Sequence, residues 1–103
     1  MTFAYTVKSE AEHEATLAAW SAWLQATHLP DVLAAGARKV ELVQFDAKHL
    51  ECRYQFESRE AFARYERDHA PKLRAEALAE FPPSSGLTMS RTSGDIVFVL
   101  NAP

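Results

Sequence analysis

The sequence predicts one α+β domain, residues 1–103, in which two helices cover one face of a four-stranded antiparallel sheet, a ferredoxin-like βαββαβ sandwich. Period-2 apolar alternation marks the strand segments, and apolar stripes at helical spacing mark two longer segments. These segments follow one another in the order strand, helix, strand, strand, helix, strand. No linker is long enough to separate two domains.

The first strand and the start of the first helix are predicted from residues 3–14. Phe3, Tyr5 and Val7 alternate with less apolar residues, which is typical of a half-buried strand. Ser9 then precedes acidic residues at positions 10, 12 and 14, and these favour the first turn of a helix. Ser9 is therefore predicted to cap a helix that runs to about residue 27.

The first helix should face the sheet through Leu17, Trp20 and Leu24, with Trp23 beside them. Pro30 is expected to force the preceding residue out of α geometry and to begin a short helical turn over residues 30–35. A glycine at position 36 supplies a left-handed stop.

Residues 37–46 and 49–57 are predicted as two strands of a hairpin that turns at Ala47 and Lys48. The second strand alternates strictly, so the sheet should have an apolar face and a polar one. The polar, open face is expected to carry Thr6, Lys8, Arg53, Gln55, Thr88 and Ser90.

Ser58 is predicted to cap the second helix, which Pro71 interrupts and which resumes to about Phe81. Two strand segments, LTMSR and IVFVL, are expected to close the sheet. The last of them, Ile96–Leu100, is apolar on both sides and needs cover on two faces. This favours a homodimer that forms through the open sheet face.

Composition narrows the classes of partner. The chain is 48% hydrophobic and 24% charged, with a net charge of -3 and no basic block, so nucleic acid is not an expected partner. The single Cys52 excludes an internal disulfide, and the N-terminus has no secretory signal, so a cytoplasmic location is expected. No run is long enough to span a membrane.

Two His-x-Pro motifs are the most informative feature of the sequence. His28 lies 4 and 8 residues after Leu24 and Trp20, and His69 lies 4 and 7 residues after Tyr65 and Phe62. Both imidazoles should therefore project from the apolar stripes, which makes His28 and His69 candidate catalytic residues. The alternative is that each is a capping or core-edge residue bonded to a carbonyl.

Aromatic residues near both histidines suggest a pocket between the helices and the sheet that suits a small apolar or aromatic ligand. Each aromatic residue taken alone is also a candidate for the core. Two histidines supply at most a pair of metal ligands, so neither a metal nor another cofactor is predicted. The predicted ligand-binding residues are Trp20, Trp23, His28, Tyr54, Tyr65 and His69.

Taken together, these residues resemble a small uncharacterised bacterial family known only as a domain of unknown function within the dimeric α+β barrel superfamily. The resemblance covers nearly the whole chain and implies a ferredoxin-like protomer whose open sheet face pairs with a second copy. It rests on Tyr5, Val7, Trp20, Trp23, Leu24, His28, Pro30, Val32, Leu33, Gly36, Tyr54, Tyr65, His69, Ala70, Pro71, Leu73 and Arg74.

The superfamily includes cofactor-independent monooxygenases, muconolactone isomerases and haem-degrading enzymes. Haem degraders have an Asn on the first strand and a Trp ten residues before the haem-ligating His, whereas this chain has no such Asn and has Arg59 ten residues before His69. Three hypotheses remain open: a dimeric protein that binds a small aromatic molecule, a cofactor-independent monooxygenase or isomerase acting on one, and a structural module without a ligand.

Overall fold

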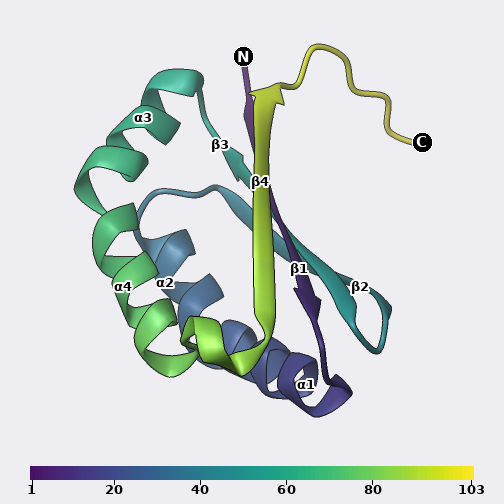
Figure 1. Cartoon of the computed structure of the whole chain (residues 1–103). Helices are drawn as coiled ribbons and strands as arrows, with labels where there is room; N and C mark the ends of the chain where they lie inside the picture. The colour runs from purple at the N-terminus through teal and green to yellow at the C-terminus, as the bar shows by residue number, and fades with distance from the viewer.

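Strand β1 (Phe3–Ala11) lies inside the sheet and pairs antiparallel with β3 (His49–Phe56) and with β4 (Leu87–Asp95). Strand β2 (Lys39–Asp46) pairs antiparallel with β3, which gives the strand order β2-β3-β1-β4. The computed structural model describes all residues, 1–103. The predicted ferredoxin-like βαββαβ sandwich is confirmed (Figure 1).

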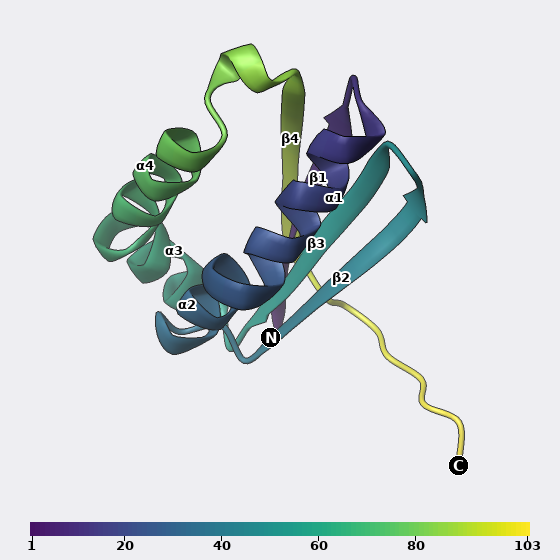
Figure 2. The same cartoon turned by 90° about the horizontal axis from the view of Figure 1, so that it is seen from below.

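All the helices lie on one face of the sheet (Figures 1 and 2). None of them combines the length and the apolar character that crossing a membrane requires. The first helical segment consists of α1 (Glu14–Trp23), the π-helical turn η1 (Leu24–His28) and α2 (Leu29–Ala34). The second consists of α3 (Arg59–Asp68) and α4 (Ala70–Glu80), and the 3₁₀ turn η2 (Pro83–Ser85) leads from it to β4.

The core forms where the alternating strands meet the helices. On β3, the residues that point to the helices are Leu50, Cys52, Tyr54 and Phe56, and all four are buried. Cross-strand register places Thr6 opposite Arg53 on the other face, which carries the predicted polar residues. The separation into an apolar and a polar face is confirmed.

The prediction that Ser9 caps the first helix is wrong. Ser9 belongs to β1 and is 3% exposed, while α1 begins at Glu14, with His13 at its N-cap. The hydroxyl of Ser9 accepts a hydrogen bond from Trp20 Nε1 at 3.1 Å. The hydroxyl of Ser9 therefore bonds to a side chain in the core instead of bonding to a backbone amide at a helix N-terminus, as the local sequence predicts.

Pro30 does not break the first helix, so that prediction is also wrong. Leu29 has α-helical dihedrals, φ -65° and ψ -42°, and the chain stays helical from Glu14 to Ala34. Its amide donates to the carbonyl of Leu24, five residues back, through the wide turn η1. Such a π turn gives the helix room for a proline without a sharp kink. The stop at Gly36, with φ +129°, is confirmed.

The hairpin and the second helix follow the prediction. Strands β2 and β3 turn at Ala47 and Lys48, and Ser58 Oγ accepts from the amide of Ala61 at 3.0 Å as the N-cap of α3. The helix breaks at His69, whose φ of -125° is not helical, and resumes at Ala70.

The prediction of a closing strand at Ile96–Leu100 is wrong for the single chain. Strand β4 ends at Asp95, opposite Phe3, where its partner strand begins. Beyond that point the tail makes one backbone hydrogen bond, from Ile96 to the carbonyl of Thr2. Val97 and Leu100 are 80% and 81% exposed, and the tail projects away from the helices (Figures 1 and 2).

Candidate ligand-binding cavity

A cavity of about 270 Å³ lies between the helices and the sheet, in the place that the sequence predicted. Strands β1, β3 and β4 form one wall, and α1, η1, α3 and α4 form the other. Ten of its thirteen lining residues are hydrophobic. The lining residues are Tyr5, Val7, Trp20, Leu24, His28, Cys52, Tyr54, Tyr65, Arg74, Ala77, Leu78, Met89 and Arg91.

An aromatic stack supports the helical wall. Trp20 and Trp23 are stacked with ring centroids 5.6 Å apart, and Trp23 stacks in turn on His28 at 5.4 Å. Trp20 lines the cavity, and its hydrogen bond to Ser9 fixes the indole. Trp23 is half-buried and stacks on both rings but does not line the cavity, which corrects its predicted place among the residues that contact a ligand.

His28 sits at the end of the π turn and is half-buried. Its Nδ1 atom is buried and has no hydrogen-bond partner. Burial lowers the pKa of His28, and this effect outweighs the nearby carboxylates of Asp31 and Glu76, which raise it. The ring is therefore neutral near pH 7. A buried N–H without a partner is more costly than an unpaired acceptor, so the proton belongs on Nε2.

Acid should destabilise the folded protein through His28. The folded pKa is depressed, so the unfolded state takes up a proton first as the pH falls below 6.5, the ordinary value. Stability present at neutral pH is then lost progressively down to the folded pKa. We expect the melting temperature to fall more between about pH 7.5 and about pH 5.5 in the parent than in His28→Gln. Equal falls in the two proteins would contradict the assignment.

Three tyrosines line the cavity, Tyr5 and Tyr54 from the sheet wall and Tyr65 from α3 in the helical wall. Tyr5 and Tyr54 are stacked with centroids 5.5 Å apart. Burial raises the pKa of Tyr65 to about 12, although the positive charges of Arg74 and Arg91 oppose the rise. Burial also raises the pKa of Tyr54. The hydroxyls of Tyr54 and Tyr65 are therefore neutral at physiological pH and can donate hydrogen bonds.

Cys52 lies on β3 in the sheet wall and is 1% exposed. Burial raises the pKa of its thiol to about 11, so the reactive thiolate is scarce at neutral pH. Cys52 is therefore a small hydrophobic residue of the core rather than a nucleophile.

His69 lies outside the cavity, so the interpretation that the two imidazoles share one pocket is wrong. The ring of His69 is exposed and borders two shallow surface depressions, one beside Asp31 and Lys72 and the other beside Gly36 and Arg64. The prediction from the spacing to Tyr65 requires an unbroken helix. Because the helix breaks at His69 itself, the helical phase no longer predicts where the ring points.

Of the six residues predicted to bind a ligand, four line this cavity: Trp20, His28, Tyr54 and Tyr65. Sequence reasoning did not identify Arg74 and Arg91 as site residues. For Arg91 a signal existed. Side chains alternate between the two faces along a strand, so assigning Thr88 and Ser90 to the open face places Arg91 on the face toward the helices. Its register partner Val7 points the same way.

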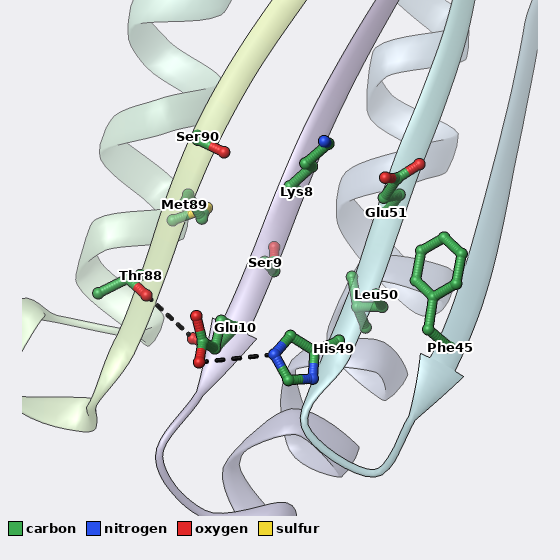
Figure 3. A pocket seen from close by; sticks show the side chains of 10 residues that line it. All are labelled: Lys8, Ser9, Glu10, Phe45, His49, Leu50, Glu51, Thr88, Met89 and Ser90. Atoms are coloured by element: carbon green, nitrogen blue, oxygen red, sulfur yellow. Dashed lines mark hydrogen bonds and ion pairs between the residues drawn. The ribbon is translucent and has the colours of Figure 1, made fainter.

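A second hollow, of about 430 Å³, lies on the open sheet face near the hairpin (Figure 3). His49 Nδ1 lies 2.8 Å from Asp46 Oδ1, and its Nε2 lies 3.5 Å from Glu10 Oε1. The hydrogen bond to Asp46 is the main cause that raises the pKa of His49. Phe45 stands at the edge of this hollow and is 57% exposed. This charged hollow differs from the aromatic cavity and belongs to the sheet face.

No group of three or more His, Cys, Asp or Glu side chains converges in an arrangement that could hold a metal ion. The residues that line the cavity offer aromatic surface, hydrogen-bond donors and guanidinium groups. These are the means by which proteins hold small organic molecules.

Comparison with known sequences adds a family but no activity. The family described as "Domain of unknown function (DUF4286)" matches residues 2–90. Among curated proteins, none matches the chain.

Solved structures share the fold at low identity. A dimeric ferredoxin-like protein from an uncultured marine organism superposes with a TM-score of 0.76 at 14% identity, over 99% of this chain and 100% of that one. A cofactor-independent oxygenase from Streptomyces nogalater gives 0.66 at 12% identity, over 98% of each chain. A monooxygenase from Streptomyces coelicolor in complex with nanaomycin D gives 0.63 at 15%, over 96% of this chain and 92% of that one.

Proposed function

Since the chain belongs to DUF4286, a family of domains of unknown function, we propose a function from its geometry: it binds a small aromatic molecule in the cavity between helices and sheet. One observation carries the proposal. The wall of a mostly apolar cavity holds a neutral imidazole, neither nitrogen of which makes a hydrogen bond within the chain, beside an aromatic stack. A packed core would seldom leave such a group without a partner.

The size and the walls of the cavity define the ligand class. Its volume of about 270 Å³ lies just below the range of roughly 300–1,000 Å³ typical of sites for drug-sized ligands. A molecule of about two fused rings suits such a space. Trp20 and Tyr54 offer ring faces and edges against which a planar molecule can pack.

His28 would orient the ligand as a hydrogen-bond donor. With its proton on Nε2, the neutral ring can donate to a ligand oxygen, and its remaining lone pair lies on the buried Nδ1. This arrangement disfavours a role for His28 as general base in an isomerase, because a base needs an accessible lone pair.

A homodimer through the open sheet face is part of the proposal. The face carries both signs of charge, and a two-fold axis lets each copy place its cations against the other's anions. The apolar tail Ile96–Leu100, exposed in one chain, would gain cover there. The charged residues are Lys8, Glu10, Lys39, Glu41, Glu51 and Arg53.

We propose that this dimer is cytoplasmic, because the single buried thiol of Cys52 suits a reducing compartment.

Cofactor-independent oxygenation of a bound phenol is the second candidate. Two of the similar structures are described as an oxygenase and a monooxygenase, the latter with nanaomycin D bound. Uptake of oxygen on mixing the protein with a dihydroxynaphthalene, with all electrons supplied by that substrate, would support this activity over binding alone.

Binding of 2-naphthol, measured by isothermal titration calorimetry, tests the proposal. We expect His28→Ala to weaken binding by about tenfold, which corresponds to one lost hydrogen bond. His28→Gln keeps an N–H donor and should retain most of the affinity. His69→Ala is the matched control, because it removes the second His-x-Pro imidazole outside the cavity. Absence of binding to the parent, or equal losses in His28→Ala and His69→Ala, would overturn the proposal.

A further inference from the structure

The charges that face the cavity do not balance. Two guanidinium groups, Arg74 and Arg91, line it. Arg74 is paired with the carboxylate of Glu66, and the imidazole of His28 is neutral near pH 7. None of the residues that line the cavity is acidic, so Arg91 has no counter-ion among them.

Arg74 is the compensated member of the pair. Its Nη2 lies 2.6 and 2.7 Å from the two carboxylate oxygens of Glu66 and donates to Tyr5 Oη at 3.4 Å. The side chains of Arg74 and Glu66 are 34% and 29% exposed. The guanidinium of Arg74 is thus already engaged, mainly by Glu66.

Arg91 is the uncompensated member. It projects from β4 on the helix-facing side of the sheet, in register with Val7, and no carboxylate lies within ion-pair distance of its guanidinium. Its positive charge is felt at the hydroxyl of Tyr65, another lining residue. Arg91 is exposed to solvent and also borders the apolar hollow, so its guanidinium can bind an anionic group whose apolar body enters the hollow.

We propose that the ligand is an aromatic carboxylate and that Arg91 binds its carboxylate group. The inference rests on the proposed function. The planar guanidinium can donate two parallel hydrogen bonds to the carboxylate, while the ring system lies against Trp20 and the tyrosines. His28 faces this ligand from the helical wall and Arg91 from the sheet wall, so the two residues together fix its orientation.

A pair of probes with the same ring system tests the inference: 2-naphthoate, which is anionic at pH 7, and 2-naphthol, which is neutral. Calorimetric titration of the parent should show 2-naphthoate binding about tenfold more tightly, as expected of a charge-assisted contact. Arg91→Gln should remove this preference and leave the affinity for 2-naphthol unchanged. Arg67→Gln is the matched control, because Arg67 is exposed on α3 and pairs with Asp68 outside the cavity.

The outcomes separate the two proposals. Equal affinity for both probes in the parent, or an unchanged preference in Arg91→Gln, would overturn the role of Arg91 and leave aromatic binding intact. Failure of the parent to bind either probe would overturn the proposed function itself. Circular dichroism of each variant checks that a lost preference does not come from unfolding.

Discussion

Trp20→Ala should lower the free energy of unfolding by about 3–5 kcal/mol, the usual range for removing a large buried aromatic side chain. Trp20 is 3% exposed, stacks on Trp23 and meets the ring of Phe81 edge-on at 5.0 Å. Its removal also leaves the buried Ser9 hydroxyl without its donor. Small domains have a total stability of roughly 5–15 kcal/mol, so this variant should be close to unfolding at ambient temperature. Urea unfolding followed by circular dichroism measures the change.

Trp23→Ala is the matched control, because it removes the same side chain from the neighbouring, half-buried position. We expect a clearly smaller loss of stability from this variant, since less apolar surface returns to water and no buried partner is left unpaired. Equal losses from the two variants would mean that the stack, and not the burial of Trp20 with its bond to Ser9, determines the stability of this region.

Removal of the tail, residues 96–103, should convert the proposed dimer into a monomer. Val97, Phe98 and Leu100 are 80%, 76% and 81% exposed in the single chain, so the apolar surface that they offer to a second copy would be lost. The tail makes one backbone hydrogen bond to the rest of the chain, so the domain itself should stay folded. Size-exclusion chromatography with light scattering measures the mass.

A double substitution, Val97→Asp with Val99→Asp, keeps the length of the tail and places two charges in the apolar segment. It should weaken the dimer as truncation does, because burying unpaired carboxylates is unfavourable. A truncated protein that keeps the mass and the dissociation constant of the parent would show that the sheet face alone holds the copies together, or that another surface does.

The strands could be predicted because their signal is local. The alternation around Tyr5 and Tyr54 is visible in the sequence, and it predicts that the sheet has an aromatic face and an open face. Ser9 shows the limit of such signals. Its surroundings favour a helix N-cap, but pairing with β3 and β4 and the bond to Trp20, eleven residues away in sequence, keep it in the strand.

The site could be predicted in part for a related reason. Trp20 and His28 lie in the cavity because they follow a helical face from the core, whereas the same argument failed for His69 once the helix broke there. Arg91 was missed because no motif marks it. Alternation with Thr88 and Ser90 predicts its side of the sheet, but its place at the cavity also depends on the pairing between β1 and β4, which periodicity does not assign.

The wide turn between Leu24 and His28 changes how this helix must be aligned with its relatives. An α-helix advances about 100° per residue, so one additional residue in a turn rotates everything after it by that angle relative to what precedes it. The inward series Leu17, Trp20, Leu24 therefore continues at Leu29 and Val32. A homologue with a regular α-helix here would need a one-residue gap, because an ungapped alignment would pair its next inward residues with His28 and the exposed Asp31 instead of with Leu29 and Val32.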